Sequence, residues 1–493
     1  MLMNQKILLS MYNRMKRLSR ASLSLRLYTS CIAYIKAAAW MAYSFNMTFR
    51  DDELEDLTFL LSKKICNIED LETDPMSVVF IDSFARDNRG LTQQYLRAIM
   101  AQHLRLVYIT DIALNSPTSS NIFEELKSYP KSEIINIPNK HRLYGIKRAQ
   151  YIYNRITEAR PGKVFMHLEP NAVEAIIALH ALPKSIERYQ INLTDHTFWL
   201  GATALDYTLE FRAYGLKVSE QERKLDKSKL LLCPYYPIIS NNPFRGFQFD
   251  TKNRCLVFSG GTSYKYVDEK HTFFVMMKRI LDENPRVIWV HAGDDMEGIR
   301  QMILSVMEES YLKRIYLIGS RDDIGEVFRH IDIYINSYPM GGGLMNLYAA
   351  RFAKPVVSLM KDVYTSANQI IGQLRDVSVD YSTIDEICIE LHHLIADVEY
   401  RRSQGETLKE STIDANLFNE LFAQLCATKA NVLPIPDTLR EVHLPTSFSM
   451  YDCRNSIVGL ITWRGLFVPY CQIKALLYYP NKIISVVIRY LKK

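Results

Sequence analysis

Residues 335–357, INSYPMGGGLMNLYAARFAKPVV, decide the fold. Three consecutive glycines, Gly341–Gly343, lie between an expected strand at 331–337 and an expected helix at 344–353, and another strand is expected at 355–359. Glycine allows a sharp turn and the close approach of another group. At a helix N-terminus, such a loop directs backbone N–H groups and the positive end of the helix dipole toward an anion. The stretch therefore predicts a phosphate-binding loop in an α/β domain.

The alternation of strand and helix continues on the N-terminal side of this loop. Strands are expected at 77–82, 104–110, 133–138, 163–168 and 189–195, and again at 255–260, 286–293 and 314–320. Helices are expected near 91–103, 141–158, 270–282, 296–309 and 323–330. Near-continuous apolar strands between helices indicate parallel sheets covered on both faces. The sequence predicts an α/β protein with two tandem Rossmann-like domains.

A stretch rich in Pro, Asn and Gly, 234–253, separates the two series of strands, and residues 380–430 have a helical pattern. We expect five segments in chain order. They are a basic helical N-terminal extension (1–76), an N-terminal Rossmann-like domain (77–237), a linker (238–253), a C-terminal Rossmann-like domain (254–430) and a C-terminal appendage (431–493).

Both ends of the chain are basic, although the net charge of +6 over 493 residues is modest and does not argue for a nucleic-acid partner. Residues 1–50 hold eight Lys or Arg and no acid. Apolar residues between Leu8 and Leu18, and again between Ile483 and Leu491, form stripes beside basic residues. Each pattern fits either a helix on an anionic membrane surface or a helix packed on the protein body.

Eight cysteines are scattered without a Cys-x-x-Cys pair, as expected of reduced thiols. No apolar run reaches the ~18 residues of a spanning helix, and basic residues interrupt any signal-peptide core. We therefore expect a cytoplasmic protein, with contact to the cytoplasmic face of the membrane left open.

In open parallel sheets, ligands bind outside the carboxyl ends of the strands. In the second domain this rule selects a second glycine loop at Gly260 and Gly261, next to Thr262 and Lys265. Asn346, in the first turn after Gly343, adds a side-chain donor. The Walker A and Gly-x-Gly-x-x-Gly patterns are absent, which argues against a nucleoside triphosphatase and a standard dinucleotide enzyme.

In the first domain the same rule selects Asp195 and His196, which follow an expected strand. His196 is a candidate general base; the alternative is a histidine that only hydrogen-bonds the loop backbone. Glu169 is a second candidate, unless it only stabilises a helix N-terminus. Arg86 and Arg89 either bind an anionic group or are solvated loop residues, and together with Gly90 they are candidates for the acceptor side.

The two domains resemble the GT-B nucleotide-sugar glycosyltransferases, of the type found in bacterial surface-polysaccharide synthesis, over about residues 77–425. Many members show a strand, a Pro-containing loop (here Pro339) and residues like GGGTTSLEALRAGVPVV, where this chain reads GGGLMNLYAARFAKPVV. The positions that match include Gly341, Gly342, Gly343, Leu347, Ala349, Pro355, Val356 and Val357.

The resemblance implies two parallel sheets facing across a cleft, with the acceptor on the side of the first domain and the nucleotide sugar on the second. It implies that the Gly341–Gly343 loop holds the donor diphosphate and that His196 lies where inverting members place a base. It also implies further donor contacts by His291, Gly293, Ser320 and Arg321. No metal and no separate cofactor are expected in this architecture.

The chain departs from the family pattern at Leu344 and Met345, which replace threonines, and at Tyr348, which replaces a glutamate. The leading hypothesis is transfer of a hexosyl-type group from a nucleotide-diphosphate sugar to a saccharide or lipid-linked saccharide hydroxyl. The alternatives are a nucleotide-sugar epimerase of the same fold and a catalytically silent binding or scaffold member at the membrane.

Overall fold

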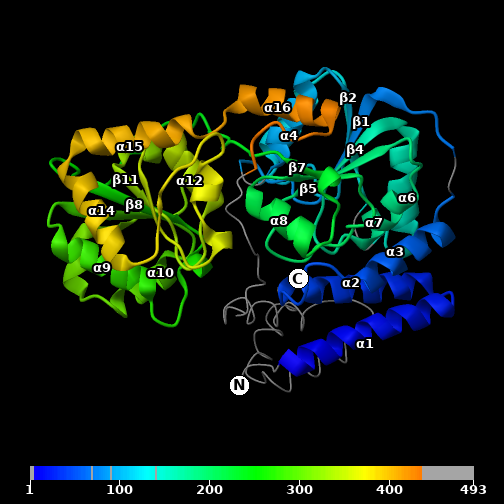
Figure 1. Ribbon diagram of the computed structural model, residues 1–493, viewed down its shortest axis with the longest axis horizontal. Helices are drawn as coiled ribbons and strands as arrows, with labels where there is room; N and C mark the ends of the chain where they lie inside the picture. The colour runs from blue at the N-terminus through cyan, green and yellow to red at the C-terminus, as the bar shows by residue number, and fades with distance from the viewer. Residues whose placement is uncertain (1–4, 68–69, 89–90, 139–141, 436–493) are drawn as a thin grey trace. The chain divides into compact units, whose positions relative to one another are not determined.

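A computed structural model describes residues 5–67, 70–88, 91–138 and 142–435 (Figure 1). The chain forms two compact units. Of the described residues, unit 1 comprises those up to Cys233 and those from Leu421 to Ile435, and unit 2 comprises Pro234–Glu420. The predictions for Arg89, Gly90 and the basic helix at the end of the appendage lie outside the described residues.

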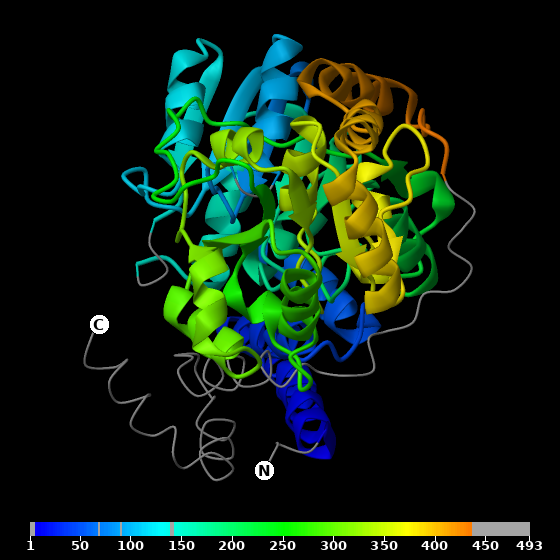
Figure 2. The same cartoon turned by 90° about the vertical axis from the view of Figure 1, so that its left-hand side faces the viewer.

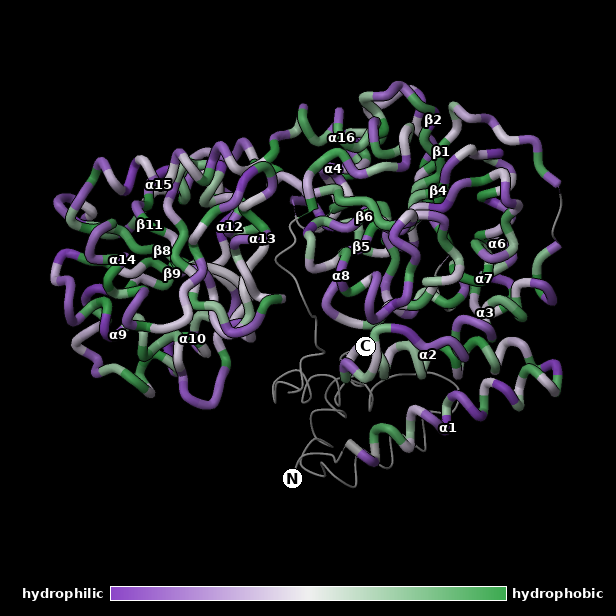
Figure 3. Tube along the Cα trace, in the orientation of Figure 1, coloured by the Kyte–Doolittle hydropathy of each residue, from purple (hydrophilic) through white to green (hydrophobic). Residues whose placement is uncertain are grey.

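Unit 1 is built on a seven-stranded sheet with the order β3-β2-β1-β4-β5-β6-β7, in which all neighbouring strands are parallel. The strands are β1 (Asp74–Asp82), β2 (Arg105–Thr110), β3 (Ser132–Asn136), β4 (Pro161–His167), β5 (Glu187–Asn192), β6 (Tyr207–Glu210) and β7 (Leu230–Leu232). The five predicted strands are present. The inner ones, β1, β2, β4 and β5, are largely buried apolar runs, whereas β3 lies at the edge of the sheet and is only partly buried (Figure 3 shows the hydropathy).

Helices follow the strands of unit 1, as expected of parallel connections. They are α4 (Thr92–Ala101), α5 (Ser120–Ser128), α6 (Gly145–Glu158), α7 (Val173–His180), α8 (Ala213–Gln221) and the 3-10 turn η1 (Lys227–Lys229).

The N-terminal extension adds two further helical layers to unit 1. Helices α2 (Tyr28–Ser44) and α3 (Asp52–Ile65) pack on α6 and α7, and α1 (Gln5–Ser24) packs on α2 and α3 (Figures 1 and 2). The apolar stripe of α1, including Leu8, Met11 and Met15, is buried in this contact. Of the two alternatives for this stripe, packing on the protein body is therefore the one observed.

Unit 2 contains a six-stranded sheet with the order β10-β9-β8-β11-β12-β13, again parallel. The strands are β8 (Cys255–Gly261), β9 (Val287–Gly293), β10 (Ile315–Leu317), β11 (Ile333–Ile335), β12 (Val356–Leu359) and β13 (Asp380–Tyr381). The helices are α9 (Thr272–Glu283), α10 (Met296–Leu304), α11 (Ile324–His330), α12 (Gly343–Arg351), α13 (Asn368–Ile371), α14 (Ile384–Ala396) and α15 (Val398–Glu410), with 3-10 turns η2 (Ser263–Tyr266), η3 (Glu309–Arg314) and η4 (Val363–Thr365). Helix α16 (Ala415–Thr428) begins in unit 2 and ends in unit 1.

The predicted linker 238–253 contains no helix or strand, but it adheres to unit 2. Phe249 stacks on Tyr316 and Phe244 on His330, each with ring centroids 3.9 Å apart. At the other boundary, the sequence assigned residues 421–430 to the second domain, whereas they belong to unit 1. There Phe422 packs against Tyr95 and Phe165.

In each sheet the strand order reverses direction beside its first strand: β2 and β4 flank β1, and β9 and β11 flank β8. In open α/β sheets, ligands bind at the carboxyl ends of strands at such a switch point. The topology therefore selects one region in each unit, without reference to any relative.

Candidate functional site

The switch point of unit 2 lies between the carboxyl ends of β8 and β11, and a glycine loop follows each strand. After β8, Gly261 adopts a φ of +146°, a conformation that other residues rarely adopt. Backbone contact is close here, since a Cβ on Gly293 at the end of β9 would lie 2.1 Å from the Gly261 carbonyl oxygen. The two predicted glycine loops thus occupy the place where the fold puts a ligand.

The loop after β11 is held by a buried asparagine that the sequence analysis did not select. Asn336 Oδ1 accepts hydrogen bonds from the amides of Ser337 (3.0 Å) and Gly342 (2.8 Å), and its Nδ2 donates to Ser358 Oγ (3.1 Å). Ser337 Oγ donates to the Met340 carbonyl. Asn336 therefore fixes the backbone of the glycine loop. Its position as the first residue after a strand was the signal that could have identified it.

Helix α12 begins directly after this loop, with Gly342 at its N-cap and no side chain capping it. The amides of Gly343, Leu344 and Met345 have no hydrogen-bond partner among the described residues, as is usual for a first helical turn. Asn346 is buried, and its Oδ1 also has no partner within the described part of the chain. This helix start can accept an anion through its backbone.

Lys265 lies beside the same loop, on the 3-10 turn after β8. Its Nζ is 3.4 Å from the Gly341 carbonyl oxygen, and the Lys265 carbonyl accepts from the Met340 amide (3.3 Å). Burial lowers the pKa of this lysine. The structure thus brings together Gly260, Gly261, Lys265 and the Gly341–Gly343 loop, as the sequence predicted. Thr262 is exposed on the same turn, and Pro339 is buried in the loop.

The other predicted donor residues have partners within the protein. His291 is fully buried, with Nδ1 2.8 Å from Ser259 Oγ, and burial lowers its pKa to about 3. Arg321 forms a two-point ion pair with Asp323 and donates to the Gly246 carbonyl (3.2 Å). Ser320 is exposed and donates to the Gly293 carbonyl. Roles for these residues in donor binding stay predictions.

The structure explains why a tyrosine, Tyr348, stands where the GT-B pattern has a glutamate. Its hydroxyl donates to the Ile238 carbonyl, and its ring stacks on Phe328 with centroids 5.8 Å apart. Tyr348 is therefore part of the core of unit 2 and anchors the start of the linker.

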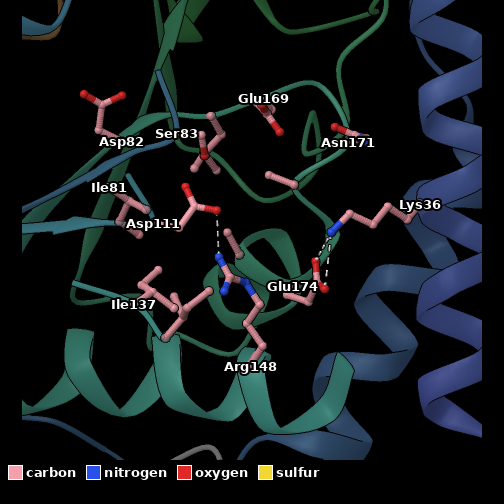
Figure 4. Close-up of a pocket in the computed structure, with 14 residues that line it drawn as sticks. Lys36, Ile81, Asp82, Ser83, Asp111, Ile137, Arg148, Glu169, Asn171 and Glu174 are labelled. Carbon is pink, nitrogen blue, oxygen red and sulfur yellow. Dashed lines mark hydrogen bonds and ion pairs between the residues drawn. The ribbon is translucent and has the colours of Figure 1, made fainter. Parts of the chain in front are cut away.

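A small, open pocket lies at the switch point of unit 1 (Figure 4). The ends of β1 and β4 line it through Asp82, Ser83 and Glu169, and α2 contributes Lys36. The lining residues are Lys36, Ile81, Asp82, Ser83, Asp111, Ile137, Arg148, Ile152, Leu168, Glu169, Asn171, Ala172, Glu174 and Ala175.

Two ion pairs lie in the wall of this pocket. Arg148 Nη2 contacts Asp111 Oδ2 at 2.9 Å, and Lys36 Nζ contacts Glu174 Oε2 at 3.1 Å (Figure 4). Burial acts to raise the pKa of Glu174, but Lys36 and hydrogen bonding outweigh it and keep that pKa below its usual value. Glu169 is exposed and adds a further carboxyl group to the pocket lining.

Asp82 and His167 form a buried pair next to the pocket, with His167 Nδ1 3.1 Å from Asp82 Oδ1. Asp82 also accepts from Thr92 Oγ1 (2.7 Å) and Tyr108 Oη (2.8 Å). The sequence pattern did not identify this pair, although both residues end strands at the switch point.

His196 lies on the loop after β5, and its side chain is 43% exposed. Its Nδ1 is 3.2 Å from Asp195 Oδ1, and the fully buried Asp195 is held by Arg212 through contacts of 2.6 and 2.9 Å. Burial acts to raise the pKa of Asp195, but Arg212 outweighs it and holds that pKa well below its usual range. In the tautomer with hydrogen on Nδ1, His196 donates to Asp195 and presents Nε2 as a proton acceptor.

Arg86 is exposed on the loop after β1. No group of three or more His, Cys, Asp or Glu that could hold a metal ion occurs among the described residues. Within the same residues, no helix is both long and apolar enough to cross a membrane.

No protein-family model and no curated protein sequence matches the chain. Solved structures do match its fold. Anabaena HepE in complex with UDP and glucose has a TM-score of 0.53 at 11% identity, over 72% of this chain and 100% of its own. A glycosyltransferase from Rickettsia africae has a TM-score of 0.54 at 9% identity, over 71% and 98% of the two chains.

The lipopolysaccharide outer core galactosyltransferase WaaB has a TM-score of 0.52 at 14% identity, over 72% of this chain and 99% of its own. These likenesses confirm the predicted α/β fold of two tandem Rossmann-like domains of the GT-B class.

Proposed function

We propose that the protein is a GT-B glycosyltransferase that moves a sugar from a nucleotide-diphosphate sugar to a hydroxyl acceptor. The observation that carries the proposal is the pair of glycine loops at the switch point of unit 2. They lie next to the first turn of α12, whose backbone amides have no hydrogen-bond partner among the described residues. A diphosphate fits backbone amides, a helix dipole and an adjacent lysine. HepE, which shares the fold, holds UDP and glucose in its crystal structure.

In this proposal the amides of Gly343, Leu344 and Met345 bind the diphosphate, while Asn346 and Lys265 add side-chain contacts. This arrangement explains how a chain without the usual threonines retains the function, because backbone amides supply the hydrogen bonds. The helix dipole and Lys265 also offset the charge of the leaving group, so we expect transfer to need no metal ion. Chelation with EDTA should leave the rate unchanged.

His196 is the proposed general base in unit 1. Its Nε2 removes the proton from the acceptor hydroxyl as that oxygen attacks the anomeric carbon, and the nucleoside diphosphate leaves with the bonding electron pair. Asp195 orients the ring and stabilises the imidazolium that forms, while Arg212 keeps Asp195 ionised. This arrangement favours inversion of the anomeric configuration.

The pocket at the switch point of unit 1 is the proposed acceptor site. Four carboxylates and two basic groups line it, and both basic groups already pair with carboxylates. A phosphate or carboxylate entering it would meet this excess of negative charge, whereas sugar hydroxyls can bond to Ser83, Asn171 and Glu169. We therefore propose an uncharged saccharide end, free or lipid-linked, as the group that receives the sugar.

Contact with a membrane surface is proposed for the outer side of α1, in a protein that works on the cytoplasmic face. The apolar stripe of this helix is buried, but Arg17 and Arg20 are exposed, and so are Leu9 (49%) and Leu25 (70%). Basic groups attract anionic lipids by about 1 kcal/mol each. Cosedimentation with phosphatidylglycerol vesicles, lost in phosphatidylcholine vesicles or at high salt, would support this contact.

The function is tested by incubating the full chain with a panel of nucleotide sugars. We expect thermal stabilisation by at least one donor and its slow hydrolysis, with weaker binding in the Lys265→Ala and Asn346→Ala variants. Conversion of a donor alone into another sugar nucleotide would indicate the epimerase alternative. No response to any donor would refute the proposal and favour the silent alternative.

A further inference from the structure

The N-terminal extension contacts the His196 loop of unit 1 at several points, although the two are about 150 residues apart in the sequence. Glu55 of α3, which is buried, accepts four hydrogen bonds from this region. Its Oε1 accepts from the amides of Gly201 (2.8 Å) and Ala202 (3.1 Å), and its Oε2 accepts from the Thr203 amide (3.2 Å) and hydroxyl (2.7 Å). Three consecutive amides thus surround one carboxylate.

A buried arginine makes the second contact. Arg223 Nη2 donates to the carbonyls of Thr194 (3.3 Å), Asp195 (3.0 Å) and Thr197 (2.6 Å), which lie on both sides of His196. The Arg223 guanidinium lies between the rings of Phe49 and Trp199, 5.3 and 5.0 Å from their centroids. Phe49 belongs to the extension, so the extension packs against the arginine that holds the loop.

Two further hydrogen bonds join the extension to this region. Arg50 Nη1 donates to the Arg223 carbonyl (2.7 Å), and Thr197 Oγ1 donates to the carbonyl of Tyr43 at the end of α2 (3.2 Å). The loop backbone is therefore fixed before, at and after His196, while the imidazole remains half-exposed. Such a loop would otherwise be among the more mobile parts of a domain.

We infer that the N-terminal extension is a positioning element for the candidate base, and that Glu55 is its principal positioning residue. Through the amides of 201–203 and through Arg223, the extension fixes the direction in which His196 Nε2 faces. The inference rests on the proposed role of His196. It gives residues 43–55 a part in the chemistry although none of them touches a substrate.

The test compares Glu55→Gln with Asp56→Asn, a matched change of carboxylate to amide at the exposed neighbouring position on α3. A glutamine Nε2 cannot accept from the Thr203 amide and hydroxyl, so those donors lose their partner. We expect hydrogen exchange of the 201–203 amides to rise about tenfold or more in Glu55→Gln. We expect the kcat of transfer to fall about tenfold or more, since small misplacements are costly.

Binding of UDP, measured by calorimetry, should stay within about twofold of the parent value, because the proposed donor groups lie in unit 2. Asp56→Asn should match the parent in exchange, kcat and UDP binding. If Glu55→Gln does not fold, Thr203→Val removes only the hydroxyl donor and should change exchange and kcat in the same direction by less.

Unchanged hydrogen exchange of the 201–203 amides in these variants would refute the proposal that Glu55 holds this loop. Faster exchange with unchanged kcat would refute the role of Glu55 in positioning His196. Full transfer activity in His196→Ala would instead overturn the proposed base. Because exchange is measured without substrate, these failures are distinguishable.

Discussion

Replacing Gly341 with alanine should damage unit 2 far more than the same change at Gly342. A Cβ at Gly341 would lie 2.7 Å from the Thr365 carbonyl oxygen and 3.1 Å from Asn336 Nδ2. The Thr365 oxygen is backbone, and it would have to move by about 0.7 Å to reach the 3.4 Å of ordinary contact. Such overpacking costs about 1–3 kcal/mol.

The displaced group matters for binding as well as stability. Asn336 holds the Gly342 amide at the N-cap of α12. A new Cβ that displaces Asn336 should therefore also displace the N-terminus of α12, where we propose that the diphosphate binds. We expect the free energy of unfolding to fall by about 1–3 kcal/mol and UDP affinity to fall about tenfold or more. Urea denaturation and calorimetric titration with UDP measure the two effects.

Gly342→Ala is the control, because the nearest atom to its Cβ would be 3.5 Å away. Alanine is a poorer N-cap than glycine but restricts the unfolded chain, so the net change should stay within about 1 kcal/mol. Equal losses of stability in the two variants, or no loss in Gly341→Ala, would refute this account of the loop.

Three further predictions concern the rest of the molecule. His291→Gln should make the free energy of unfolding less sensitive to acid. The pKa of His291 is about 3 in the folded protein and ~6.5 in the unfolded chain, so the parent loses up to roughly 4 kcal/mol of stability as pH falls through that range. Urea denaturation at pH 7 and pH 4.5 measures this loss in parent and variant. Asp195→Asn should lower stability by about 3–5 kcal/mol, since it breaks the buried ion pair with Arg212, whereas an unchanged melting temperature would contradict that pairing. Phe422→Ala should cost about 3–5 kcal/mol in urea denaturation, and a cost near zero would show that α16 does not complete unit 1.

The long central strands could be predicted because each is a continuous run of buried apolar residues. Every predicted strand of both sheets is present within three residues of its expected bounds. The strands β6, β7 and β13 were missed, since their two to four residues (YTLE, LLL and DY) carry no readable periodicity. The stripe on α1 predicted an amphipathic helix, but the pattern does not identify the surface that buries it.

The candidate site was predictable where backbone conformation requires a particular residue, as at Gly261 and Gly341. Contacts between side chains and groups that are distant in the sequence could not be predicted. Asn336 reads as an ordinary polar residue until the loop folds back over it. Glu55 reads as one of several acids on an amphipathic helix, and only the tertiary structure brings the 201–203 amides to it. Local sequence patterns therefore predict the backbone conformation of the site. They do not predict the side chains, distant in the sequence, that hold this backbone in place.

The return of the chain to unit 1 has a consequence for how the protein is made. Asn431 accepts from the Leu232 amide (2.6 Å) and donates to the Leu230 carbonyl (2.9 Å), so it pairs with the edge strand β7. Unit 2 is thus an insertion whose entry and exit are joined by hydrogen bonds. On the ribosome, all of unit 2 must emerge before Phe422 and Asn431 can complete unit 1. Unit 1 therefore begins first and is completed last, and β7 lacks its Asn431 hydrogen bonds until then.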